Sequence, residues 1–193
     1  MAAFPESRIS SPEAYLAMER ISPVKHEYLN GNIFQMAGAS VEHGIITVNI
    51  SSTINVQFKG RECNVFASDM RVFIPAIGFY TYPDIVAVCG KREMADDDHF
   101  DNLLNPTVIV EVLSKSTAQY DTGRKLDHYR SIDSLQHYLM VWQDVKRALL
   151  YSRRDDDWSL QDFIGGEPVI EMPAINCKLS MDEIYDKVDL RVK

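Results

Sequence analysis

One run of seven residues, 107–113, constrains the fold of this chain more than any other part of its sequence. It reads TVIVEVL, and every residue except Glu111 is β-branched or aliphatic, the composition of a strand that is buried on both faces. Burying a lone carboxylate costs several kcal/mol unless the group is paired, protonated or bound to a metal. The run therefore predicts a buried strand and requires a specific partner for Glu111.

A second aliphatic run, DIVAVC at residues 84–89, begins with another carboxylate, that of Asp84. Residues two apart in a strand share a face, so Glu111 lies on the face of Ile109 and Asp84 on the face of Val86. If the two strands pair with these faces matched, the carboxylates lie close together and repel each other. A divalent cation between them removes that repulsion and supplies a Lewis acid and an activated water.

The rest of the chain reads as helices and strands in a mixed order, which predicts an α/β or α+β fold with a mixed central sheet flanked by helices. At 193 residues the chain is most simply one domain spanning 1–193. Ser10, Pro12 and Glu13 predict an N-terminal helix, and Asn30-Gly31 predicts a hairpin after it. The other expected elements are helices over 41–59, 120–132 and 180–188, strands over 63–67, 70–74 and 137–142, and a C-terminal antiparallel meander over 147–164.

Composition excludes several classes of protein. A formal net charge of −8 argues against an indiscriminately basic, nucleic-acid-coating surface, but not against a nucleic-acid enzyme. Cys63, Cys89 and Cys177 are far apart and odd in number, so we expect no disulfide framework and a reducing, cytoplasmic location. The opening MAAFPESRIS lacks the apolar core of a leader, and no apolar run approaches the ~20 residues of a membrane-spanning helix.

The predicted helix after the Glu111 strand carries a third candidate group. Asp121, Lys125 and Tyr129 are four residues apart, so they fall on one helical stripe. From there the Lys125 ammonium can reach the cation site and orient a hydroxide or stabilise charge on a phosphate. The same spacing also fits an ordinary surface pair between Asp121 and Lys125, and Tyr129 is expected in the core.

The chain resembles the Uma-type family of bacterial endonucleases in three stretches: YPDIVAV, PTVIVEVLSKST with a following Asp, Lys and Tyr, and HEYLNGNIFQMAGASVEH upstream. That family is similar to a branch of the PD-(D/E)xK, or restriction-endonuclease-like, superfamily. The resemblance runs from about Tyr15 to Trp142 and places Asp84 at the Asp of PD and Glu111 at the first residue of E-x-K. It implies a Mg²⁺-dependent DNA phosphodiesterase in which Mn²⁺ substitutes for Mg²⁺, with a mixed sheet flanked by helices and, in many members, a homodimer.

One position departs from the superfamily pattern. The lysine of E-x-K would fall at Leu113, which cannot act in that role. In sequences similar to this one the lysine is displaced into the following helix, which here gives Lys125, with Lys115 as the second candidate. Glu27 and His43 also match upstream motifs as a third metal ligand or a water-orienting group, and Glu27 is favoured because a hard cation prefers oxygen. A hydrogen bond at a helix start also explains His43.

Two functions fit these observations. The first is a metal-dependent endonuclease that hydrolyses DNA, with Asp84 and Glu111 holding the metal and Lys125 assisting the attacking water or the developing charge. The second is a catalytically inactive nuclease fold that acts as a binding or regulatory module, which Leu113 and the acidic balance favour. Glu111 alone also fits a structural partner of a buried Arg or Lys. The basic residues considered for a DNA groove are Arg61, Arg71, Arg124, Lys125 and Arg130.

Overall fold

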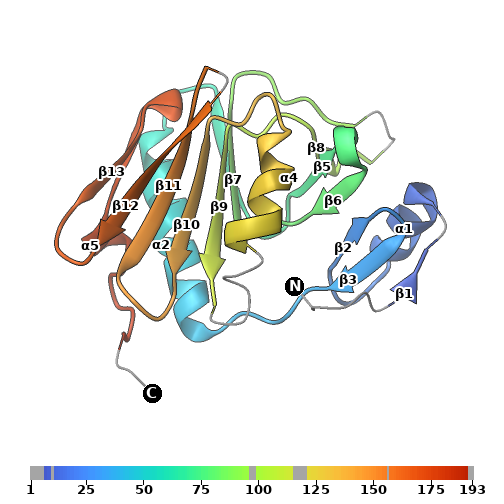
Figure 1. The fold of residues 1–193 in the computed structure, drawn as a ribbon, viewed down its shortest axis with the longest axis horizontal. Coiled ribbons are helices and arrows are strands. Elements are labelled where there is room, and N and C mark those ends of the chain that lie inside the picture. Colours follow the sequence, from blue (N-terminus) through green and yellow to red (C-terminus); the bar gives the residue numbers. More distant parts are fainter. Residues whose placement is uncertain (1–6, 10, 96–98, 115–120, 156, 191–193) are drawn as a thin grey trace.

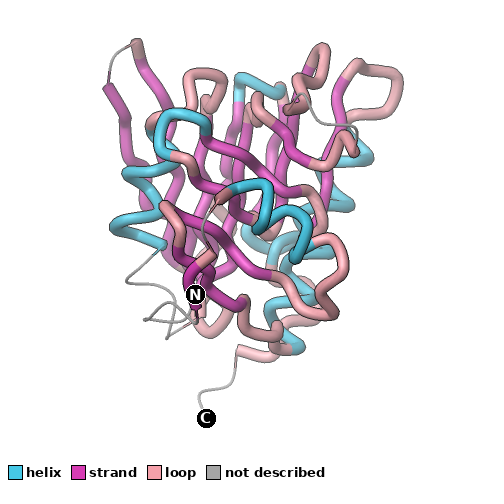
Figure 2. Tube along the Cα trace, turned by 90° about the vertical axis from the view of Figure 1, so that its right-hand side faces the viewer, coloured by secondary structure: helices cyan, strands magenta, loops and turns pink. Residues whose placement is uncertain are grey.

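The computed structural model describes residues 7–9, 11–95, 99–114, 121–155 and 157–190 of the chain. Within these residues the fold is mixed α and β, with two six-stranded sheets, a two-stranded hairpin and helices packed around them (Figure 1). Figure 2 shows the same fold from the side on which the N-terminal segments lie. The predicted class, a mixed sheet flanked by helices, is confirmed.

The central sheet has the strand order β12-β11-β10-β9-β7-β4. In chain order its strands are β4 (Cys63–Ala67), β7 (Ile85–Cys89), β9 (Val108–Leu113), β10 (His137–Trp142), β11 (Arg147–Arg154) and β12 (Asp157–Ile164). The β9–β10 pair is parallel and the other pairs are antiparallel. Every residue of β9 is buried, as the aliphatic composition of this run predicts.

The two faces of β9 contribute to different cores. Val108 and Val110 pack in the core that contains the buried residues of α2 (Val41–Gln57), whereas Ile109 packs in the core that contains those of α4 (Leu126–Arg130). The two helices therefore cover opposite faces of the central sheet (Figure 1). Glu111 shares the face of Ile109, so its side chain points toward the α4 side.

The N-terminal part forms the expected helix and hairpin. The helix α1 (Pro12–Glu19) begins after Ser11, whose hydroxyl accepts a hydrogen bond from the Ala14 N–H, while Ser10 lies outside the described residues. Asn30 and Gly31 both have positive φ, 48° and 84°, as the tight turn requires. The hairpin extends into a second sheet of order β1-β3-β2-β6-β5-β8. Its strands are β1 (Ser7–Arg8), β2 (His26–Leu29), β3 (Asn32–Gln35), β5 (Arg71–Ile74), β6 (Phe79–Thr81) and β8 (Asn102–Leu103).

The helices differ from expectation mainly after β9. The segment predicted as one helix over 120–132 is a π-helical turn, Asp121–Lys125, followed by the short α4. The closing helix α5 (Met181–Ile184) has a capping box formed by its N-cap serine, and it follows a hairpin of β13 (Val169–Met172) and β14 (Cys177–Ser180). Among the helices of the described segments, none has both the length and the apolar character that crossing a bilayer requires.

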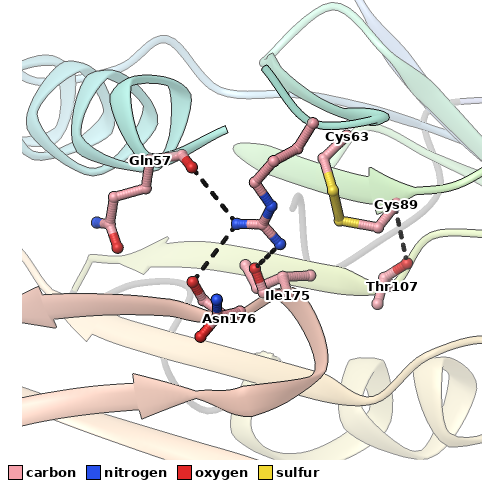
Figure 3. Close-up of a disulfide and its surroundings, with 7 residues drawn as sticks. Gln57, Cys63, Cys89, Thr107, Ile175 and Asn176 are labelled. Carbon is pink, nitrogen blue, oxygen red and sulfur yellow. Dashed lines mark hydrogen bonds between the residues drawn. A yellow bond between two sulfur atoms is a disulfide. The ribbon is translucent and has the colours of Figure 1, made fainter. Parts of the chain in front are cut away.

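The expectation that no disulfide forms is wrong. Cys63 and Cys89 are directly opposite each other in the antiparallel β4–β7 pair, and their sulfur atoms are bonded (Figure 3). They are 26 residues apart in sequence, but strand pairing removes that separation. Cys177 is free and buried. The cysteine content therefore no longer supports the expectation of a reducing location.

Candidate active site

An open cavity lies beyond the ends of β7 and β9, and it gathers side chains from distant parts of the sequence. Its lining includes all five residues that the sequence predicted for the site and that the structure describes: Glu27, His43, Asp84, Glu111 and Lys125. Glu27 comes from β2, His43 from the first turn of α2, and Lys125 from the end of the π-helical turn. The alternative lysine at position 115 lies outside the described residues.

The register of β7 and β9 places the two central carboxylates on neighbouring positions. Ile85 is paired with Val110, so the same register continued by one residue puts Asp84 opposite Glu111. Residues directly opposite in an antiparallel pair project on the same side of the sheet. The sequence pattern indicated this matching of faces, and the structure brings both carboxylates to one cavity.

His43 fixes the carboxylate of Asp84. Its Nε2 lies 3.1 Å from Asp84 Oδ2, and the same oxygen accepts a hydrogen bond of 2.7 Å from the Val112 N–H. Burial lowers the pKa of His43, but the hydrogen bond and the negative charge of Asp84 outweigh burial, so the pKa lies above its ordinary value. The His43 backbone N–H also donates to Ser40, the N-cap of α2. His43 thus has both the structural hydrogen bond and the contact with the site.

Glu111 and Glu27 share one ammonium group. The Nζ of Lys125 lies 2.8 Å from Glu111 Oε1 and 3.3 Å from Glu27 Oε1. The side chains of Lys125 and Glu111 are 6% exposed and that of Glu27 is 2% exposed. The Lys125 ion pairs are therefore buried, unlike those of an ordinary surface pair. The side chain of Asp121, the other residue of the expected pair, lies outside the described part of the structure. In this state Glu111 is the partner of a buried lysine.

Two further residues hold these carboxylates, and sequence reasoning assigned neither to the site. The Tyr129 hydroxyl donates to Glu111 Oε1 at 2.7 Å, and the Thr81 hydroxyl donates to Glu27 Oε1. Burial and the negative charge of Glu111 raise the pKa of Tyr129 well above its ordinary value, so its hydroxyl keeps its proton. Tyr129 is in the core as expected. Its position one helical turn after Lys125 was the sequence signal that could have predicted its contact with Glu111. Nothing in the sequence around Thr81 signals its contact.

The oxygen donors of the cavity fit a hard divalent cation. Mg²⁺ is commonly held by one or two protein carboxylates together with water, and the cavity offers two, from Asp84 just before β7 and from Glu111 in β9. The Lys125 ammonium between Glu27 and Glu111 shows that these carboxylates already surround a positive charge. Across the described segments, no three His, Cys, Asp or Glu side chains are arranged to hold one metal ion together. Asp84 and Glu111 are therefore the two carboxylates that we assign as metal donors.

Two of the basic residues considered for a DNA groove have other roles. Arg71 is buried, with hydrogen bonds to Asn102 and Tyr82 and an ion pair with Asp101. Arg61 donates to the carbonyl oxygen of Ile175, in the turn between β13 and β14. Neither Arg61 nor Arg71 is among the residues that line the cavity.

Comparison with known proteins gives the family. Residues 12–183 match the model of the Uma2 family, which is described as "Putative restriction endonuclease". Two proteins of Synechocystis sp. are similar over most of their length. "Uncharacterized protein slr1290" is 34% identical over 176 residues, which cover 91% of this chain and 90% of that protein. "Uncharacterized protein sll1609" is 33% identical over 166 residues, 86% of this chain and 93% of its own.

One solved structure shares the fold. It is the crystal structure of "a putative nuclease belonging to DUF820" from Anabaena variabilis, with a TM-score of 0.73 and 18% identity, covering 92% of this chain and 98% of that chain. At that identity the likeness shows the fold alone. Because the family model covers most of the sequence, the chain belongs to the Uma2 family of restriction-endonuclease-type proteins.

Proposed function

We propose that this protein is a divalent-metal-dependent endonuclease that hydrolyses phosphodiester bonds of DNA in the cavity between β2, α2 and the ends of β7 and β9. One observation carries the proposal: Asp84, which directly precedes β7, and Glu111 in the adjacent strand β9 line the same cavity as the buried ammonium of Lys125. Two carboxylates and a lysine are the group types that phosphodiester hydrolysis uses for charge and water. Family membership supports a nuclease in general terms.

Asp84 and Glu111 are the residues that would hold the metal, and Glu27, which the sequence offered as a third ligand, instead contacts the Lys125 ammonium. Mg²⁺, or Mn²⁺ in its place, supplies a Lewis acid for the phosphate and an activated water when it is bound there. Other groups of the chain hold the carboxylate oxygens of Asp84 and Glu111 in place. His43 and the Val112 N–H contact the Asp84 carboxylate, and the Tyr129 hydroxyl donates to the Glu111 carboxylate.

Lys125 is the residue of the cavity best placed to act on the phosphate. Its ammonium carries three donors on a flexible stem, so it can stabilise negative charge that develops on the phosphate oxygens in the transition state. The net charge of −8 means that DNA affinity must come from local cations of this kind. Lys25, which lies at the same cavity and is 38% exposed, is a second such cation. A homodimer would bring two cavities to one duplex.

The proposal is tested by incubating purified protein with supercoiled plasmid in Mg²⁺, in Mn²⁺ and in EDTA. We expect nicked and linear products with either metal and none with EDTA. Asp84→Asn and Glu111→Gln should lose cleavage, whereas Glu171→Gln, an exposed carboxylate on β13 that pairs with Lys178, should retain it. Cleavage by Glu111→Gln at the parental rate would overturn the assignment.

A second function has one specific observation in its favour. Lys125 compensates the charge of Glu27 and Glu111, which is also what a catalytically inactive binding or regulatory module would need. Melting temperatures separate the two functions, because a metal that binds only the folded state raises the melting temperature. A rise in millimolar Mn²⁺ that disappears in the double Asp84→Asn, Glu111→Gln variant supports the enzyme. Absence of any rise in the parent supports the module.

A further inference from the structure

We propose that Lys125 is an internal competitor of the metal: its ammonium contacts both Glu27 and Glu111, and a divalent cation must displace it from Glu111 in order to bind. This inference rests on the proposed metal site and adds a regulation of that site. It concerns the affinity of the site for metal, so it can be tested without any cleavage assay.

The contacts show that the pocket is built around the ammonium. The same oxygen of each carboxylate, Oε1, faces Lys125 Nζ, at 2.8 Å for Glu111 and 3.3 Å for Glu27. Each of these oxygens also accepts one hydroxyl hydrogen bond, from Tyr129 and Thr81 respectively. The four partners come from four different elements, β2, β6, β9 and α4, so the arrangement depends on the tertiary fold.

Burial makes this pairing strong. The three charged side chains are at most 6% exposed, so water screens their charges poorly. Removing one partner of a buried ion pair leaves an uncompensated charge in a medium that solvates it badly. Lys125 therefore allows Glu27 and Glu111 to remain buried side by side before any metal arrives.

Because Lys125 Nζ lies so close to Glu111 Oε1, the ammonium and a divalent cation cannot both contact this oxygen. A cation that binds Glu111 Oε1 would share an oxygen that the ammonium already contacts, and two positive charges at such a distance repel each other. The lysine stem has four rotatable carbons, so the ammonium can leave while its backbone stays in the π-helical turn. Metal binding would thus release the ammonium toward the phosphate.

Asp84 provides the first point of attachment for the incoming metal. Its carboxylate pairs with His43 and the Val112 N–H rather than with Lys125. The cavity therefore contains one carboxylate whose contacts do not involve Lys125 and a second that the lysine holds. Metal affinity is set by the cost of separating Lys125 from Glu111 as well as by the ligands themselves.

The experiment measures Mn²⁺ affinity by calorimetric titration, and the Mn²⁺-induced rise in melting temperature, for the parent and for Lys125→Met. We expect Lys125→Met to melt at a lower temperature without metal, to bind Mn²⁺ about tenfold more tightly or better, and to gain a larger rise in melting temperature. Lys125→Arg keeps the positive charge and should bind Mn²⁺ as weakly as the parent.

The matched control is Lys25→Met. Lys25 lies at the same cavity, but its Nζ contacts the Ser68 carbonyl oxygen and Asp69. Removing this cation changes the general electrostatic attraction for metal without freeing the carboxylate pair. An increase in affinity for Lys25→Met equal to that for Lys125→Met would overturn the proposal, and so would equal or weaker Mn²⁺ binding by Lys125→Met.

A measurement on the parent keeps the proposal testable if Lys125→Met does not fold. The ammonium signal of Lys125 in ¹⁵N-labelled protein, assigned by its loss in Lys125→Arg, should be protected from exchange without metal and lose that protection in saturating Mg²⁺. A signal unchanged by Mg²⁺ would overturn the proposal. Tighter Mn²⁺ binding by Lys125→Met together with no DNA cleavage by the parent would uphold this inference and reject the endonuclease. Absence of Mn²⁺ binding in every variant would reject the inference and the metal site together.

Discussion

Lys125 Nζ lies 2.8 Å from Glu111 Oε1, although the lysine follows the glutamate by 14 residues and comes from a helical turn rather than from the strand. The strand position that carries the lysine in E-x-K is occupied by Leu113, which is 0% exposed and packs in the same apolar core as Leu126 and Tyr129. A lysine at position 113 would have to enter that core. The fold therefore brings the ammonium to Glu111 from the α4 side.

Replacement of Glu111 by glutamine tests this relationship. Glu111→Gln keeps the size of the side chain but removes the charge that faces Lys125 and the proposed metal. We expect cleavage to fall by about 100-fold or more, because the side chain is both a proposed ligand and the holder of the lysine. The fall is measured as the rate of plasmid nicking under saturating Mn²⁺, with Glu171→Gln as the exposed control. A rate within about twofold of the parent would contradict the role of Glu111.

The hydroxyl of Tyr129 separates positioning from simple packing. Tyr129→Phe removes the donor to Glu111 Oε1 and leaves the ring in the core. We expect a loss of about 2 kcal/mol in the free energy of unfolding, because the hydrogen bond is to a charged group. The value of kcat should fall by roughly tenfold or more while KM changes little, since the residue orients a ligand without contacting DNA.

Tyr185→Phe is the matched control for this variant. The Tyr185 hydroxyl lies within 2.9 Å of the carbonyl oxygens of Trp142, Val145 and Arg147, to which it can donate its one hydrogen, and it accepts a hydrogen bond from the Arg147 N–H. Its loss should reduce the free energy of unfolding without changing kcat. If Tyr129→Phe and Tyr185→Phe lose stability alike and both keep kcat, Tyr129 has a structural role only.

Several parts of the fold could be read from the sequence because their signals are local. The aliphatic run of β9, the Asn30-Gly31 turn and the long helix α2 each depend on residues that are near one another in the chain. The second sheet could not be predicted in this way. Its strands β1, β6 and β8 have two or three residues each, too few to show alternation. β1 and β8 form only by pairing with segments more than 20 residues away in the chain.

The candidate site shows the same division. Asp84 and Glu111 could be matched in advance because Glu111 lies in a strand whose faces alternate and Asp84 directly precedes the neighbouring strand. The contact between Lys125 and Glu27 joins residues almost 100 positions apart, so only the tertiary fold reveals it. The disulfide was missed for the same reason, since Cys63 and Cys89 become neighbours only when β4 pairs with β7. Spacing along the chain does not report such pairings.

The stability of this protein should depend on pH through His137. The ring is 4% exposed; its Nε2 accepts a hydrogen bond from the Ala174 N–H and its Nδ1 contacts the Ser152 hydroxyl. Burial lowers the pKa of His137 from 6.5 to about 4, so the folded state keeps the ring neutral. Between these values the unfolded chain binds a proton that the folded chain does not. The free energy of unfolding should therefore fall as the pH falls from about 6.5 toward 4.

Urea unfolding at several pH values checks this expectation. His137→Gln provides the control, because glutamine retains hydrogen-bonding capacity but does not titrate. The parent should lose more stability than this variant between pH 6.5 and about 4, and the two should show parallel curves above pH 7. Parallel curves over the whole range would show that His137 does not contribute to the pH dependence.

Reduction of the Cys63–Cys89 disulfide should destabilise the fold. The bond joins two cysteines that are 26 residues apart in sequence. It connects the edge strand β4 to β7, the strand that begins directly after Asp84. In the chain-entropy model a loop of this length contributes about 3–4 kcal/mol to the free energy of unfolding, because the cross-link restricts the unfolded chain. The melting temperature of the parent should therefore fall when dithiothreitol is added. The double variant Cys63→Ser, Cys89→Ser should melt at the lower temperature with or without the reductant. An equal response of the parent and the double variant to dithiothreitol would show that the two thiols are not paired in solution.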